Sequence, residues 1–177
     1  MYFEELKQNL IGLVKESQLK LGYSDTSCNL YYPAEALNHL LGTELPIPQL
    51  ETALQEFGTY AAEELGMVTF SRKGELFCLT IPKEGAAYVH EHVENNGFLE
   101  AFIDCMRDGH CTIEEVLAVF HRFSNHVTVE KSNNEEFDYL IYFTDGVPDN
   151  YRYCLHEEFG HMIYHRFTPR EFETFAF

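Results

Sequence analysis

Hydrophobic residues in the first third of the chain recur at helical spacing. The pattern predicts helices over residues 2–21, 32–41 and 48–65, each followed by a glycine, with a polar loop joining the first two. The period then changes, and Met67–Ser71 and Glu75–Ile81 predict two strands joined by a tight turn. Three helices followed by a hairpin is the element order of a winged helix-turn-helix.

The rest of the chain repeats this order in part. Thr112 with Glu115 forms a capping box that begins one further helix, and Thr168 with Glu171 forms a second box that begins a short terminal helix. The other elements expected here are helices over 83–95 and 98–107 and strands over 127–132 and 137–145.

These elements predict an α+β fold built from two winged-helix-like lobes packed as one compact unit. Asn95-Asn96-Gly97 is the best boundary between them. The N-terminal lobe then covers residues 1–96. The C-terminal lobe covers residues 97–177 and adds a β-meander and the terminal short helix.

The charge of the chain is strongly acidic. Twelve Lys and Arg stand against 29 Asp and Glu, which gives a formal net charge of −17, and residues 21–71 contain no Lys or Arg at all. A duplex phosphate backbone is bound chiefly through basic side chains, so no nucleic-acid partner is expected. An acidic surface suits solubility, cations or a basic protein partner, and a protein partner is the one expected here.

The cysteines and the first residues of the chain indicate where the protein works. The five cysteines are odd in number and form no Cys-x-x-Cys pair, which is typical of free thiols in a reducing compartment. The sequence shows no export signal and no apolar run long enough to span a bilayer. A cytoplasmic location without membrane contact is therefore expected.

One segment invites a metal-site hypothesis, because residues 156–161 read His-Glu-Glu-Phe-Gly-His. Its two histidines are five residues apart, so they diverge on a helix and do not match the zinc-metalloprotease motif. If residues 154–167 were helical, however, Glu157, His161 and His165 would share one face. They could then bind zinc or another divalent ion, with His156 in support, and activate water as in a metal-dependent hydrolase.

The same segment is better explained by two strands. Gly160 and the aromatic, β-rich flanks favour strands that turn near Glu158-Phe159-Gly160. His161 and His165 would still share a face in that arrangement, but without an obvious third ligand. Neighbouring Cys105, His110 and Cys111 fit none of the usual zinc spacings and are expected to be half-buried residues around a turn.

Three segments resemble an uncharacterised bacterial family known only as a domain of unknown function of about this length. They are Leu30-Tyr31-Tyr32-Pro33, Leu155-His156-Glu157-Glu158-Phe159-Gly160-His161 and Thr168-Pro169-Arg170-Glu171. The resemblance covers nearly the whole chain. It implies a cytoplasmic bacterial protein and supplies no activity, ligand or catalytic residue.

The sequence therefore leaves the function unknown and ranks three hypotheses. A non-catalytic, acidic protein-interaction module comes first, since none of the common nucleotide-binding or hydrolase motifs is present and no catalytic residue or cofactor is assigned. The metal-dependent hydrolase of the His156–His165 segment is the alternative. A winged-helix DNA binder comes third, because the helix that would enter the major groove, 48–65, has four glutamates and no basic residue.

Overall fold

The computed structural model describes residues 1–174 of the chain and divides it into two compact units, Met1–Glu94 and Asn95–Phe177. Each unit combines helices with its own antiparallel sheet, so the predicted α+β class is confirmed. Within the described residues, no helix is both long and apolar enough to cross a membrane.

Unit 1 is a three-stranded sheet with five helices around it. The strands are ordered β1-β3-β2, and both pairings are antiparallel. The elements of this unit are α1 (Phe3–Leu21), β1 (Cys28–Pro33), α2 (Ala34–Leu41), α3 (Ile47–Tyr60), α4 (Ala62–Leu65), β2 (Thr69–Lys73), β3 (Leu76–Ile81) and α5 (Lys83–His92).

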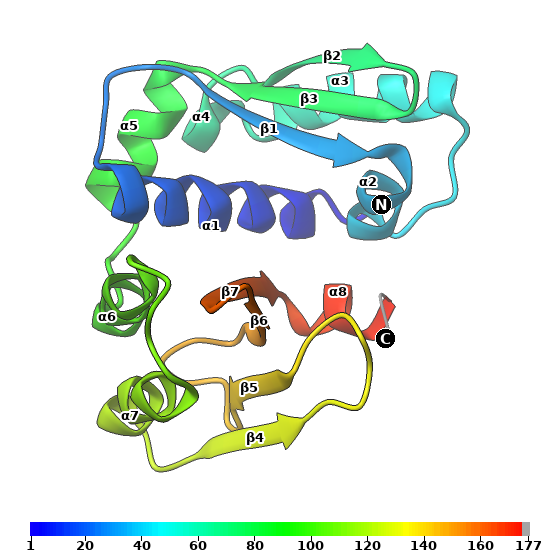
Figure 1. Cartoon of the computed structure of the whole chain (residues 1–177). Coiled ribbons are helices and arrows are strands. Elements are labelled where there is room, and N and C mark those ends of the chain that lie inside the picture. The colour runs from blue at the N-terminus through cyan, green and yellow to red at the C-terminus, as the bar shows by residue number, and fades with distance from the viewer. Residues whose placement is uncertain (175–177) are drawn as a thin grey trace. The chain divides into compact units, whose positions relative to one another are not determined.

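Helix α1 runs along the sheet, with α2 near its N-terminal end and α5 near its C-terminal end (Figure 1). Two hydrogen bonds fix these ends. The Tyr2 amide donates to the Leu41 carbonyl at 2.9 Å, and Gln18 Nε2 donates to the Ala86 carbonyl at 2.9 Å. Between them the apolar stripe of α1 enters the core, where Leu6 and other leucines are fully buried.

Strand β1 corrects the sequence analysis, which assigned residues before Tyr32 to a polar loop. Its residues pair with β3, for example Leu30 with Leu79 and Tyr32 with Phe77. Exposed and more buried residues alternate along it, but only Tyr32 is fully inside. A short edge strand of this kind is stabilised by a partner about fifty residues away, so its local hydrophobic pattern is weak.

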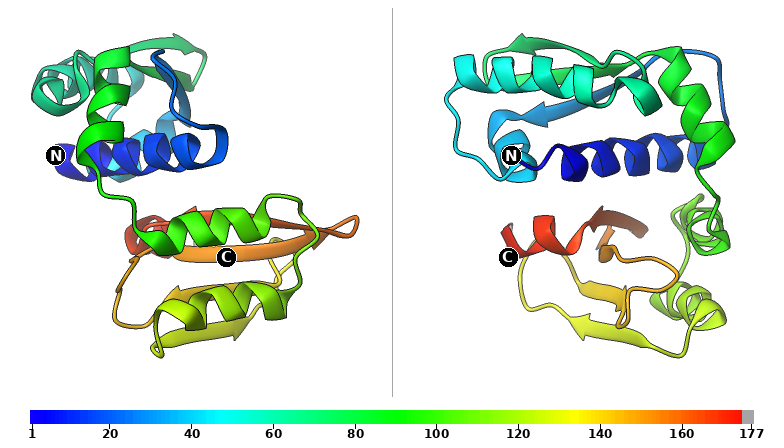
Figure 2. Two further views of the ribbon diagram at one scale, coloured as in Figure 1. Left: turned by 90° about the vertical axis from the view of Figure 1, so that its left-hand side faces the viewer. Right: turned by 180° about the vertical axis from the view of Figure 1, so that it is seen from behind.

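Unit 2 is a four-stranded antiparallel meander, with neighbours in the order β4-β5-β6-β7 (Figure 2). Helices α6 and α7 pack against each other before all four strands, so this unit does not repeat the element order of unit 1. Its elements are α6 (Gly97–Met106), α7 (Ile113–Phe123), β4 (Val127–Lys131), β5 (Tyr139–Phe143), β6 (Arg152–Glu158), β7 (His161–Phe167) and α8 (Pro169–Thr174).

Aromatic rings fill the core between the helices and the sheet of unit 2. Phe98 packs edge-on against Phe120 and Phe143, each at 4.7 Å between ring centroids. Phe102 meets Tyr153 in the same way, also at 4.7 Å. All five side chains are buried, so this ring cluster fixes how the two helices cover one face of the sheet.

The segment that the sequence left open between helix and strand forms a hairpin. Strands β6 and β7 are joined by a tight turn in which Phe159 and Gly160 have positive φ values of 52° and 78°. Glycine adopts this conformation without steric cost, and Phe159 points into solvent. The predicted pair of strands with a turn at Gly160 is confirmed.

Candidate functional site

The three residues of the metal hypothesis do not converge on one point. Strand register pairs Glu157 with Met162 and pairs Cys154 with His165. Directly opposed residues of antiparallel strands point to the same face, and successive residues alternate between faces. Glu157 therefore lies on the face covered by α6 and α7, whereas His161 and His165 lie on the opposite face.

Two histidines of the hairpin have neighbours outside the proposed ligand set. The His161 ring lies 4.9 Å from the His110 ring, while His156 Nδ1 is 3.7 Å from Asp138 Oδ2. Among residues 1–174, no group of three or more His, Cys, Asp or Glu side chains is arranged to hold a metal ion. The hydrolase hypothesis thus gains no assembled ligand set from the described part of the chain.

A pocket of about 320 Å³ lies beside Glu157, at the start of α7. Three of its lining residues, Glu114, Asp138 and Glu157, are acidic and exposed. Asp138 Oδ2 accepts the Glu157 amide at 2.9 Å, which ties the loop before β5 to β6. A pocket with this lining attracts cations and repels anionic ligands such as phosphates.

The lining of the same pocket includes two sulfur-containing side chains, those of Cys111 and Met162. The Cys111 thiol donates to the Met106 sulfur at 3.3 Å. The Cys105 thiol lies close enough to Cys111 for the two to shift each other's pKa. Burial, reinforced by Cys105, raises the pKa of the Cys111 thiol to about 12, and burial also raises the pKa of Cys105. Both thiols are therefore protonated at neutral pH, which makes them poor nucleophiles.

The acidic surface of unit 1 centres on the helical stretch α3–α4. Glu56 and Glu63 are exposed on it, and Glu51 is partly exposed. Glu51 Oε1 binds Arg72 Nε of the β2–β3 hairpin at 2.7 Å, and Arg72 also donates to the Gly74 carbonyl at 2.6 Å. The charge of Arg72 is thus engaged by an acidic residue of the neighbouring helix.

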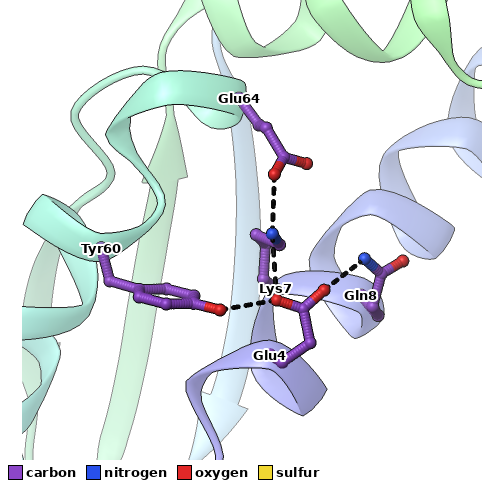
Figure 3. Close-up of polar contacts among 5 residues, drawn as sticks. All are labelled: Glu4, Lys7, Gln8, Tyr60 and Glu64. Carbon is purple, nitrogen blue, oxygen red and sulfur yellow. Dashed lines mark hydrogen bonds and ion pairs between the residues drawn. The ribbon is translucent and has the colours of Figure 1, made fainter.

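Lys7 of α1 is buried, and its charge is also paired with carboxylates, as Figure 3 shows. Lys7 Nζ lies 2.7 Å from Glu64 Oε1 and 3.0 Å from Glu4 Oε2. The hydrogen bond to Glu64 is the main reason that the pKa of Lys7 is raised above its usual value. Glu4 also accepts hydrogen bonds from Tyr60 at 2.6 Å and Gln8 at 2.8 Å.

These bonds change the titration of Glu4. The Tyr60 hydroxyl contributes most, and together with Gln8 and Lys7 it lowers the pKa of Glu4 to about 2. The Glu4 side chain is still 55% exposed, so solvent screens its charge and reduces what these bonds contribute to the free energy of unfolding. The network nevertheless ties α1 to the end of α3 and to α4, and it leaves the exposed charge of this surface acidic.

Sequence reasoning found only part of these sites. It placed the acidic helix correctly, but it missed Met106 as a neighbour of the cysteines, because a methionine on an apolar helix face is usually core. The five-residue spacing of Met106 and Cys111 was the available signal. The pairing of Arg72 with Glu51 joins residues 21 apart and had no local signal.

Comparison with known proteins identifies the family of the chain. The model of DUF3877, described as a domain of unknown function and named from E. rectale, matches residues 3–176. No curated protein and no solved structure matches the chain.

Proposed function

The chain belongs to the DUF3877 family of bacterial domains of unknown function, and from this premise we propose that it is a non-catalytic, acidic protein-interaction module. Its binding surface is the exposed face of α3 and α4, which carries Glu56 and Glu63. The partner is a protein with a basic surface, and the complex forms in the cytoplasm. The observation that carries the proposal is the acidic character of this face, where Arg72 is already paired.

We infer that unit 1 is a winged helix whose wing is the β2–β3 hairpin. The order α1-β1-α2-α3-α4-β2-β3, in which α4 is a single turn after α3, and the strand order β1-β3-β2 support this inference. In a winged helix that binds DNA, α3 would enter the major groove and basic residues around it would meet phosphates. Here α3 carries no Lys or Arg, so protein binding fits the charge and duplex binding does not.

Affinity capture from a bacterial lysate tests the proposal with two matched variants. Glu56→Gln with Glu63→Gln removes two charges from the proposed surface, and Glu84→Gln with Glu91→Gln removes two from α5, where both are also exposed. We expect a basic protein to be retained by the wild type and by the α5 variant, and to be lost from the α3–α4 variant and at high salt.

Equal retention by all three proteins, or no retained protein at all, would contradict the proposal. Fluorescence anisotropy with a labelled DNA duplex tests the third hypothesis, that the protein is a winged-helix DNA binder. We expect no rise in anisotropy at low salt, whereas a salt-sensitive rise would favour DNA binding.

A further inference from the structure

We propose that Cys105, Met106 and Cys111 form a binding site for a soft monovalent metal ion, with Cu(I) as the ion that their chemistry fits best. The proposal is independent of the interaction surface on unit 1. Cys105 and Met106 end helix α6, and Cys111 lies just before α7, so the three residues flank one short turn.

The contacts among the three side chains carry the proposal. The sulfur atoms of Cys111 and Met106 are 3.3 Å apart. Cys105 directly precedes Met106, and its thiol lies close enough to Cys111 for each to shift the pKa of the other. This set differs from the predicted ligands Glu157, His161 and His165 in both position and chemistry.

The donor types select the metal. Thiolates and thioethers are soft ligands that favour Cu(I), whereas carboxylates and carbonyls favour Mg²⁺ or Ca²⁺. Structural zinc sites use four protein ligands arranged as a tetrahedron, so two thiols and a thioether are an incomplete zinc set. Cu(I) forms stable complexes with two or three sulfur donors and therefore matches the number present.

The surrounding residues give a metal ion access to the thiols and supply negative charge near them. Cys111 lines the 320 Å³ pocket whose acidic residues Glu114, Asp138 and Glu157 attract cations. Cys105 reaches a second depression between α6 and α7, which Arg122 also lines. Binding releases one proton from each thiol and leaves a site of net charge −1, because one Cu(I) balances one of the two thiolates.

Competition for Cu(I) against the chromophoric chelator bathocuproine disulfonate tests the site. The reduced, tag-free full chain is titrated anaerobically. We expect the wild type to withdraw one Cu(I) per chain, and we expect Cys105→Ser with Cys111→Ser to abolish this withdrawal. The matched control, Cys28→Ser with Cys78→Ser, removes two thiols of similar burial elsewhere and should bind as the wild type does.

A third variant tests the thioether. Met106→Leu conserves side-chain volume, so folding should be kept, and far-UV circular dichroism checks this. We expect it to weaken Cu(I) binding at least about ten-fold, as loss of a metal-site contact typically does. X-ray absorption should show three sulfur neighbours in the wild type and two in this variant.

Three results would overturn the proposal. In the first, the wild type withdraws no copper from the chelator. In the second, the Cys105→Ser, Cys111→Ser variant binds copper as tightly as the Cys28→Ser, Cys78→Ser control. In the third, Met106→Leu leaves both the affinity for Cu(I) and the number of sulfur neighbours unchanged.

Discussion

Replacing Asp149 by Asn removes the charge from a buried polar cluster in unit 2. Asp149 Oδ2 accepts the Tyr153 hydroxyl at 2.8 Å, and Oδ1 accepts the Tyr151 amide at 2.8 Å. Arg166 Nη1 lies 3.9 Å from Oδ2, and the two charged side chains are only 4% and 3% exposed. The cluster ties the loop before β6 to both strands of the last hairpin.

The size of the expected destabilisation follows from the interactions that each group of the cluster loses. Removing one partner of a buried ion pair costs about 3–5 kcal/mol, because the remaining charge is left in a poorly solvated site. The long 3.9 Å separation places this pair at the lower end of that range, as does the Tyr151 ring, which lies 4.1 Å from the Arg166 guanidinium and continues to stabilise it. The Asn side chain also keeps an acceptor for the Tyr151 amide. We therefore expect a loss of about 3 kcal/mol in the free energy of unfolding.

Urea unfolding of the full chain, followed by far-UV circular dichroism at neutral pH, measures this loss. Tyr153→Phe removes only the hydroxyl donor and should cost about 1.5 kcal/mol, since its acceptor is charged. Asp145→Asn changes an exposed residue of the same loop and should stay within about 0.5 kcal/mol of the wild type. If Asp149→Asn matched the Asp145→Asn control, the buried charge pair would not stabilise the fold as argued.

Three further predictions concern local features. Thr112→Ala removes the N-cap of α7, whose side chain accepts a backbone amide, and should cost about 1 kcal/mol in thermal or urea unfolding. Gly85→Ala places a methyl group against the Leu65 carbonyl and should lower the free energy of unfolding by about 2 kcal/mol or more. As a control, Gly97→Ala meets only the edge of the Phe123 ring at 3.5 Å and should be tolerated. Equal stability of the two variants would refute the predicted clash at Gly85. The lowered pKa of Glu4 means that its ionised form stabilises the fold above pH 4.5 and that this contribution is lost as the pH falls toward 2. Glu4→Gln should therefore flatten the dependence of stability on pH in that window, by less than about 1 kcal/mol because the side chain is half exposed.

The local elements of this protein could be read from the sequence because short-range physics fixes them. The capping boxes at Thr112 and Thr168 satisfy helix amides within three residues, and both are present in the structure. Gly160 permits a turn with positive φ, which favoured a hairpin over a helix in the segment around it.

Long-range pairing decided the features that the sequence did not indicate. Strand β1 depends on β3, so its residues carried little helical or extended pattern of their own. The faces on which Glu157 and His165 lie depend on the register between β6 and β7. A list of candidate ligands could therefore be written from the sequence, but their separation could not be foreseen.

The sequence by itself determined the α+β class, most helices, the final hairpin and the acidic character of unit 1, because composition, periodicity and caps act over a few residues. Tertiary structure alone brought Asp149 to Arg166 and Glu51 to Arg72. Each of these contacts depends on how turns and strands fold back on one another. Burial then sets how strongly each pair interacts, because a charged side chain removed from water must be stabilised by the protein groups around it.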